Sequence, residues 1–171
     1  MNERHAWLLT APKRMRLAAF VIGVLLAFAL ANVRAEESGM KPSPKDKCPV
    51  CGMFVHKYPD FLACILLTDG SRFFFDGPKD LCKYYLNVQK YDPKHRQTDI
   101  VSIRVKDYYS LAAIDGRRAF YVVGSDVYGP MGNELIPFEK ESEAREFMSD
   151  HAGKRLLRFG DITEAIVKGL D

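Results

Sequence analysis

Three sulfur-bearing side chains lie close together near position 50, in residues 48–53 (CPVCGM). Thiolate and thioether sulfurs are the soft ligands that select Cu(I), whereas carboxylate-rich sites select harder ions. Gly52 allows a tight backbone turn between Cys51 and Met53. If Met53 opens a strand, the side chains of Cys51 and Met53 leave on one face and can reach one ion. The segment therefore predicts a soft-metal site.

A further methionine extends this hypothesis to a second part of the chain. Met131 lies in residues 129–132 (GPMG), a loop with no other obvious use for methionine. Cys51 would supply the thiolate, and Met53 and Met131 the thioethers. Cys48 is then either a fourth ligand or a redox guard that forms a disulfide with Cys51.

Other uses of the cysteines remain open. Cys48 and Cys51 form a C-x-x-C pair, but a thioredoxin-type site needs a helix at the second cysteine, and Gly52 and β-prone residues follow here. A structural zinc site would need Cys64 and Cys82 to complete a four-cysteine set. An exported chain with four cysteines could also hold them in two disulfides. Cys64 alternates with leucines and is expected to be a core residue.

The first 35 residues are predicted to be a secretory signal. A basic segment precedes an apolar run, and a small-x-small site ends at Ala35. The run is shorter than the roughly 20 residues that a membrane-spanning helix needs. Residues 1–35 hold five of the 25 basic residues and one of the 22 acidic ones, so 20 basic face 21 acidic residues beyond them. Bulk charge therefore gives no reason to expect nucleic-acid binding.

Apolar patterning predicts alternating strands and helices. Asp69-Gly70 is a hairpin signal, and Asp76 is a candidate N-cap for a helix that starts with Gly77-Pro78. A second helix is expected over 141–151 and a short last one around 162–166. Val101 is expected to share one face of its strand with Ile103. Strands are predicted over 54–56, 61–68, 71–75, 100–109, 119–123, 135–138 and 156–159.

A faint internal repeat organises these elements. Each of the two longer helices follows a strand, and a sulfur-bearing glycine loop precedes each strand. We therefore predict an α+β fold of two small ββαβ-type lobes sharing a cleft, with each lobe donating a ligand loop. The expected boundaries are a flexible lead-in over 36–46, an N-terminal lobe over 47–92 and a C-terminal lobe over 93–171.

The motifs together resemble the nitrous oxide reductase accessory protein family (NosL), over about residues 47–162. The resemblance rests on their order and spacing, which is more specific than Cys-Gly-Met alone. The segments that carry it are Cys51-Gly52-Met53, Phe75-Asp76, residues 121–125 (YVVGS), residues 129–132 (GPMG) and Pro137-Phe138.

The resemblance implies a periplasmic, non-enzymatic Cu(I) metallochaperone with Cys51, Met53 and Met131 as ligands. It implies delivery of copper to nitrous oxide reductase, or to a related exported cuproenzyme, with an ABC-type transporter as assembly partner. Members are commonly lipoproteins, but no cysteine follows the apolar run here, so membrane contact is expected only through a partner or an uncleaved signal. The alternatives are a periplasmic thiol-disulfide protein using Cys48 and Cys51, and an interaction module with all cysteines in disulfides.

Overall fold

The computed structural model describes residues 40–171. The predicted signal peptide and the first residues of the predicted lead-in lie outside this described part. Within residues 40–171, no helix is long and apolar enough to cross a membrane. Helices and antiparallel sheets share the described chain, which confirms the predicted α+β class.

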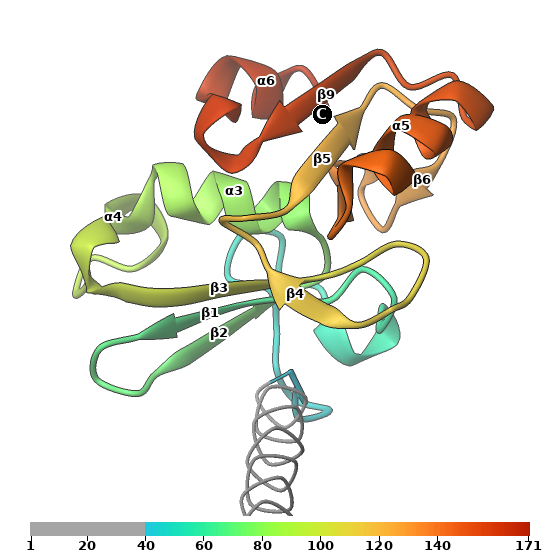
Figure 1. The fold of residues 1–171 in the computed structure, drawn as a ribbon. Coiled ribbons are helices and arrows are strands. Elements are labelled where there is room, and N and C mark those ends of the chain that lie inside the picture. Colours follow the sequence, from blue (N-terminus) through green and yellow to red (C-terminus); the bar gives the residue numbers. More distant parts are fainter. Residues whose placement is uncertain (1–39) are drawn as a thin grey trace, which may run out of the picture. The chain divides into compact units, whose positions relative to one another are not determined.

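The first sheet has four antiparallel strands in the order β2-β1-β3-β4 (Figure 1). Gly70, at φ +86°, closes the predicted hairpin between β1 and β2 in a conformation that costs glycine little. Helices α3 and α4 lead from β2 to β3, and α3 packs on β1 and β2. The elements are β1 Ala63–Leu67, β2 Arg72–Phe75, α3 Pro78–Leu86, α4 Val88–Tyr91, β3 Ile100–Lys106 and β4 Ala113–Asp115.

The second sheet has three antiparallel strands in the order β8-β5-β9, and helix α5 packs on all three. A two-stranded hairpin, β6–β7, lies between β5 and β8, and Pro130 and Met131 form its turn. The last helix, α6, packs against α3. The elements are β5 Phe120–Val123, β6 Tyr128–Gly129, β7 Gly132–Asn133, β8 Ile136–Phe138, α5 Glu141–Asp150, β9 Arg155–Arg158 and α6 Glu164–Lys168.

The two sheets repeat one chain path. In the first, β1-β2-α3-β3 gives the spatial order β2-β1-β3, and in the second, β5-β8-α5-β9 gives β8-β5-β9. The larger buried core contains residues of both sheets, among them Phe75, Tyr121 and Leu157. Because one core runs through both halves, the predicted boundary at residue 92 and the shared cleft stay predictions.

The predicted strand over 54–56 is wrong. Val55–Lys57 is a 3₁₀ turn, and Phe54 makes only an isolated bridge to Lys47. The carbonyl groups that a strand would offer to a neighbour are used in this local turn, because Phe54 O accepts from Lys57 N–H across 3.2 Å and Val55 O from Tyr58 N–H across 3.0 Å. Met53 therefore does not open a strand, and the argument that placed it on one face with Cys51 does not hold.

Candidate metal centre

The cysteine loop, residues 48–53, is closed by its own backbone. Cys48 N–H donates to Met53 O, and Gly52 N–H donates to Cys48 O, each across 2.9 Å. Gly52 has φ +78°, a left-handed conformation that disfavours residues with a Cβ. The loop buries Cys48 and leaves Cys51 half-buried. It therefore presents two thiols from one tight turn.

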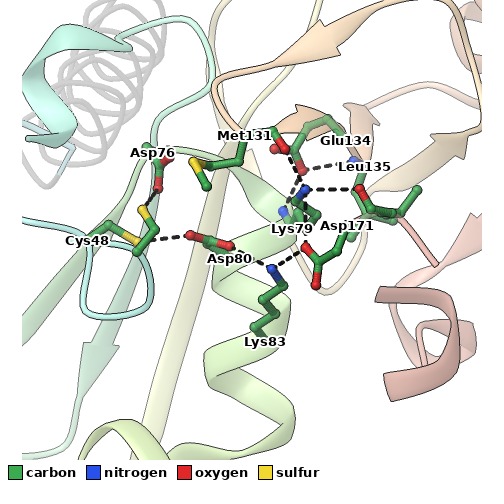
Figure 2. Close-up of polar contacts among 11 residues, drawn as sticks. Cys48, Asp76, Lys79, Asp80, Lys83, Met131, Glu134, Leu135 and Asp171 are labelled. Atoms are coloured by element: carbon green, nitrogen blue, oxygen red, sulfur yellow. Dashed lines mark hydrogen bonds and ion pairs between the residues drawn. The ribbon is translucent and has the colours of Figure 1, made fainter. Parts of the chain in front are cut away.

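The start of helix α3 supplies the groups that face these thiols. The prediction that Asp76 caps this helix is wrong, because the N-cap is Gly77, which has no side chain with which to cap it. Asp76 Oδ1 instead accepts a hydrogen bond from Cys51 Sγ across 3.2 Å, and Asp80 Oδ2 accepts one from Cys48 Sγ across 3.4 Å. One potential ligand atom from each residue lies within 4.8 Å of the others (Figure 2).

The two carboxylates are buried and incompletely paired. Asp76 and Asp80 are 1% and 2% exposed. Asp76 Oδ2 and Asp80 Oδ1 have no hydrogen-bond partner, although Lys83 Nζ lies 3.5 Å from the latter. Buried polar atoms without partners are costly and rare in folded proteins. A cation bound between the thiols and carboxylates would satisfy them, so the geometry fits a metal centre.

Burial and the facing carboxylates set the protonation of the thiols. Burial is the main cause that raises the pKa of Cys51 to about 12, and Asp80 and Asp76 raise it further. The pKa of Cys48 is raised even more strongly, again chiefly by burial. Both thiols therefore carry protons at neutral pH in the metal-free protein. Since metals bind thiolate, loading must release these protons.

The loop that carries Met131 is anchored to the same helix. Met131 O accepts a hydrogen bond from Lys79 Nζ across 2.8 Å, and the side chain is 44% exposed. In Figure 2 the thioether is directed toward the side of α3 on which Cys48, Asp76 and Asp80 lie. Met53 is half-buried beside Gly52. The membership of both methionines in a ligand set stays a prediction.

The sequence reasoning missed Asp76 and Asp80. Their spacing of four residues across a predicted helix start was the available signal, because residues four apart share one face of a helix.

Cys64 and Cys82 are buried outside the cluster. In the described part of the chain the four cysteines form no disulfide, which contradicts the alternative with every cysteine in a disulfide.

Comparison with known proteins decides the family. The NosL family model matches residues 39–167. The chain belongs to the NosL family. The copper-binding lipoprotein NosL of Stutzerimonas stutzeri is 28% identical over 165 residues, covering 88% of this chain and 83% of that protein. The copper-binding lipoprotein NosL of Achromobacter cycloclastes is 31% identical over 170 residues, covering 90% and 84%.

A solved NosL structure has the same fold. The copper chaperone NosL from Shewanella denitrificans superposes with a TM-score of 0.61 at 26% identity, covering 72% of this chain and 93% of that one. The family resemblance inferred from the motifs is thus confirmed. The NosL relatives are named for binding and chaperoning copper, which confirms the prediction of a metal-binding protein rather than an enzyme.

Proposed function

We propose that this NosL-family protein is a periplasmic Cu(I) metallochaperone, exported by its N-terminal signal. Its client is nitrous oxide reductase or a related exported cuproenzyme, and an ABC-type transporter takes part in assembly. The family membership and the relatives' names support copper as the cargo. The observation that carries the proposal is the pair of cysteine thiols held within 4.8 Å of two buried carboxylates.

In the proposed ligand set, Cys51 supplies thiolate, Met53 and Met131 supply thioethers, and Cys48 is the fourth ligand or a redox guard. Soft sulfur donors favour Cu(I). Asp76 and Asp80 hold the protonated thiols in place before loading. The half-buried position of Cys51 and the exposed position of Met131 leave copper accessible to a partner's sulfur or imidazole groups. Transfer then proceeds by ligand exchange, without turnover chemistry.

Competition between Cu(I) and Zn(II) tests this proposal. Zinc accepts cysteine and carboxylate ligands but binds thioether poorly. A site made only of the two cysteines and two aspartates would suit zinc, whereas recruitment of methionine would favour Cu(I). Anaerobic titration of the reduced protein against chelators of known affinity should give much tighter binding of Cu(I). Tighter binding of Zn(II) would overturn the proposal.

The thiol-disulfide alternative finds less support in the site. Reactive cysteines of that class have a lowered pKa, whereas burial raises the pKa of both Cys48 and Cys51, and Asp76 raises both further. No helix begins at Cys51 to stabilise a thiolate. Reduction of insulin disulfides by the metal-free protein at a rate comparable to thioredoxin would favour this alternative over the chaperone.

A further inference from the structure

Glu134 joins the second half of the chain to the start of helix α3. It follows β7 directly and is 3% exposed. Its Oε1 accepts hydrogen bonds from the backbone N–H groups of Leu135 and of Lys79, a residue 55 positions away. Lys79 lies in the first turn of α3, where backbone N–H groups have no partner within the helix. Glu134 therefore caps this helix from a distant segment.

Lys79 makes the reciprocal connection. Its side chain is 1% exposed, and Nζ donates to Met131 O across 2.8 Å and to Leu170 O across 3.1 Å (Figure 2). A buried ammonium group is costly unless its protons are accepted. The Met131 carbonyl is one of the acceptors that make this burial tolerable. Lys79 of the helix thus holds the loop that carries Met131. Glu134, three residues after Met131, in turn holds the start of the helix.

Two glycines show how closely these segments approach. A Cβ placed on Gly77 would overlap Glu134 Oε2, and one on Gly129 would lie 2.9 Å from that oxygen. Gly77 precedes α3, and Gly129 precedes the Pro130-Met131 turn. The Glu134 carboxyl group therefore fills the space between the two motifs, and glycine at both positions leaves room for it.

We propose that Lys79 and Glu134 are positioning residues for the copper site. They fix the Met131 loop against the start of α3, which carries Asp80 and follows Asp76, so that the thioether faces the cysteine loop before copper arrives. This inference rests on the proposed Cu(I) function. Holding a ligand in its bound position removes the ordering cost from the binding step. Lys79 and Glu134 thus raise copper affinity without touching the metal.

A double-mutant cycle tests this role. Lys79→Met should lower the Cu(I) affinity, and the decrease in the logarithm of the binding constant should be at least half of that caused by Met131→Ala. Both decreases are measured by anaerobic competition well below the melting temperature. If Lys79 acts through Met131, the combined variant should bind within about twofold of Met131→Ala alone, since effects through one shared group are not additive. Full additivity of the two losses would overturn the inference.

Glu134 offers a matched pair of variants. Glu134→Gln keeps a side-chain oxygen that can accept from Lys79 and Leu135, so its affinity for Cu(I) should stay close to that of the wild type. Glu134→Ala removes the acceptor and should lower the affinity. The amide order parameters of residues 129–133 should fall in Glu134→Ala and in Lys79→Met but not in Glu134→Gln. Unchanged loop order in both disruptive variants would contradict the inference.

A destabilised control separates positioning from general loss of stability. Phe147→Leu alters the ring cluster with Tyr108, Phe138 and His151. It should lower the melting temperature while leaving Cu(I) affinity unchanged. If wild type binds no Cu(I), or Met131→Ala binds like wild type, the ligand set of the proposed function fails. If Met131→Ala weakens binding but Lys79→Met and Glu134→Ala do not, only the positioning role fails.

Discussion

Asp76 Oδ1 lies 3.2 Å from Cys51 Sγ, although 25 positions separate the two residues in the chain. The contact joins the cysteine loop to the start of helix α3. It places a hard carboxylate beside a soft sulfur donor, with the second carboxylate, Asp80, beside Cys48. The thiols are thereby held protonated until a metal that binds sulfur strongly replaces their protons.

Asp76→Asn should lower the pKa of the Cys51 thiol. The substitution keeps the shape of the side chain but removes a negative charge that disfavours thiolate. The pH dependence of iodoacetamide alkylation at Cys51, resolved by mass spectrometry, measures this. Asp60→Asn, at an exposed aspartate, is the control and should leave the profile unchanged. An unaltered profile in Asp76→Asn would show that the carboxylate does not control the thiol.

Cys51→Ser should abolish tight Cu(I) binding, because it removes the thiolate assigned to the metal. Met131→Ala should weaken binding. Met148→Ala is a matched control in the half-buried part of α5 and should retain wild-type affinity. Anaerobic competition titrations compare the three variants. Wild-type affinity in Met131→Ala would contradict a site built from two loops.

The role of Cys48 can be resolved with Cys48→Ser. If Cys48 guards Cys51, the metal-free wild type should form their disulfide in air, because the two sulfurs share one cluster. Copper loading would then need a reductant in the wild type but not in Cys48→Ser. If Cys48 is a ligand, Cys48→Ser should bind more weakly even when fully reduced. Measuring the copper affinity of the wild type and of Cys48→Ser, each with and without reductant, distinguishes the two roles. Identical affinity in all four conditions excludes both.

Glu134 should make stability depend on pH. Burial raises its pKa to about 8, while Lys79 lowers it and Asp80 raises it. Because the folded protein favours neutral Glu134, its stabilisation is complete below the ordinary glutamate pKa of 4.5 and is lost as pH rises towards 8. Stability relative to Glu134→Gln should fall by up to about 1.4 kcal/mol per pH unit in this window. Urea unfolding of the wild type and of Glu134→Gln from pH 5 to 8 measures this difference in stability. Parallel plots of stability against pH for the two proteins would contradict the prediction.

Phe147→Ala should destabilise the fold by about 3–5 kcal/mol, as expected for a buried phenylalanine replaced by alanine. Phe147 is fully buried and packs with Phe138 and Tyr108 in the second core cluster. Chemical denaturation measures the loss. Arg145→Ala, at an exposed position on the same helix, should cost far less.

Strands in the buried core were predictable because their apolar runs are continuous: 61–68 contains β1, and 119–123 contains β5. Val101 was misplaced for a local reason. Leu66 pairs with Ser102 and Leu67 with Ile100, so a bulge at Val101 breaks the alternation and leaves its side chain 53% exposed. A bulge depends on the register of the neighbouring strand, which periodicity within one strand does not contain.

The candidate site was predictable only for its sulfur atoms. Clustered cysteine and methionine have few other uses in a short loop, so residue type alone indicated Cys51 and Cys48. Asp76 was assigned to the helix cap because an aspartate before Gly-Pro commonly caps a helix. Its real partner, Cys51, is distant in sequence. Such a contact is set by tertiary packing, which overrides the local preference.

The bonds of Lys79 also bear on the order in which the chain can fold. Residues 47–92 contain the thiols, Asp76, Asp80 and all of α3, but the groups that pair with the Lys79 ammonium group come from residues 131, 170 and 171. A chain that stops before Met131 would bury an unpaired charge and leave the helix start without Glu134. The first half is therefore not expected to fold alone, and the proposed copper capture has to wait until the second half has joined it.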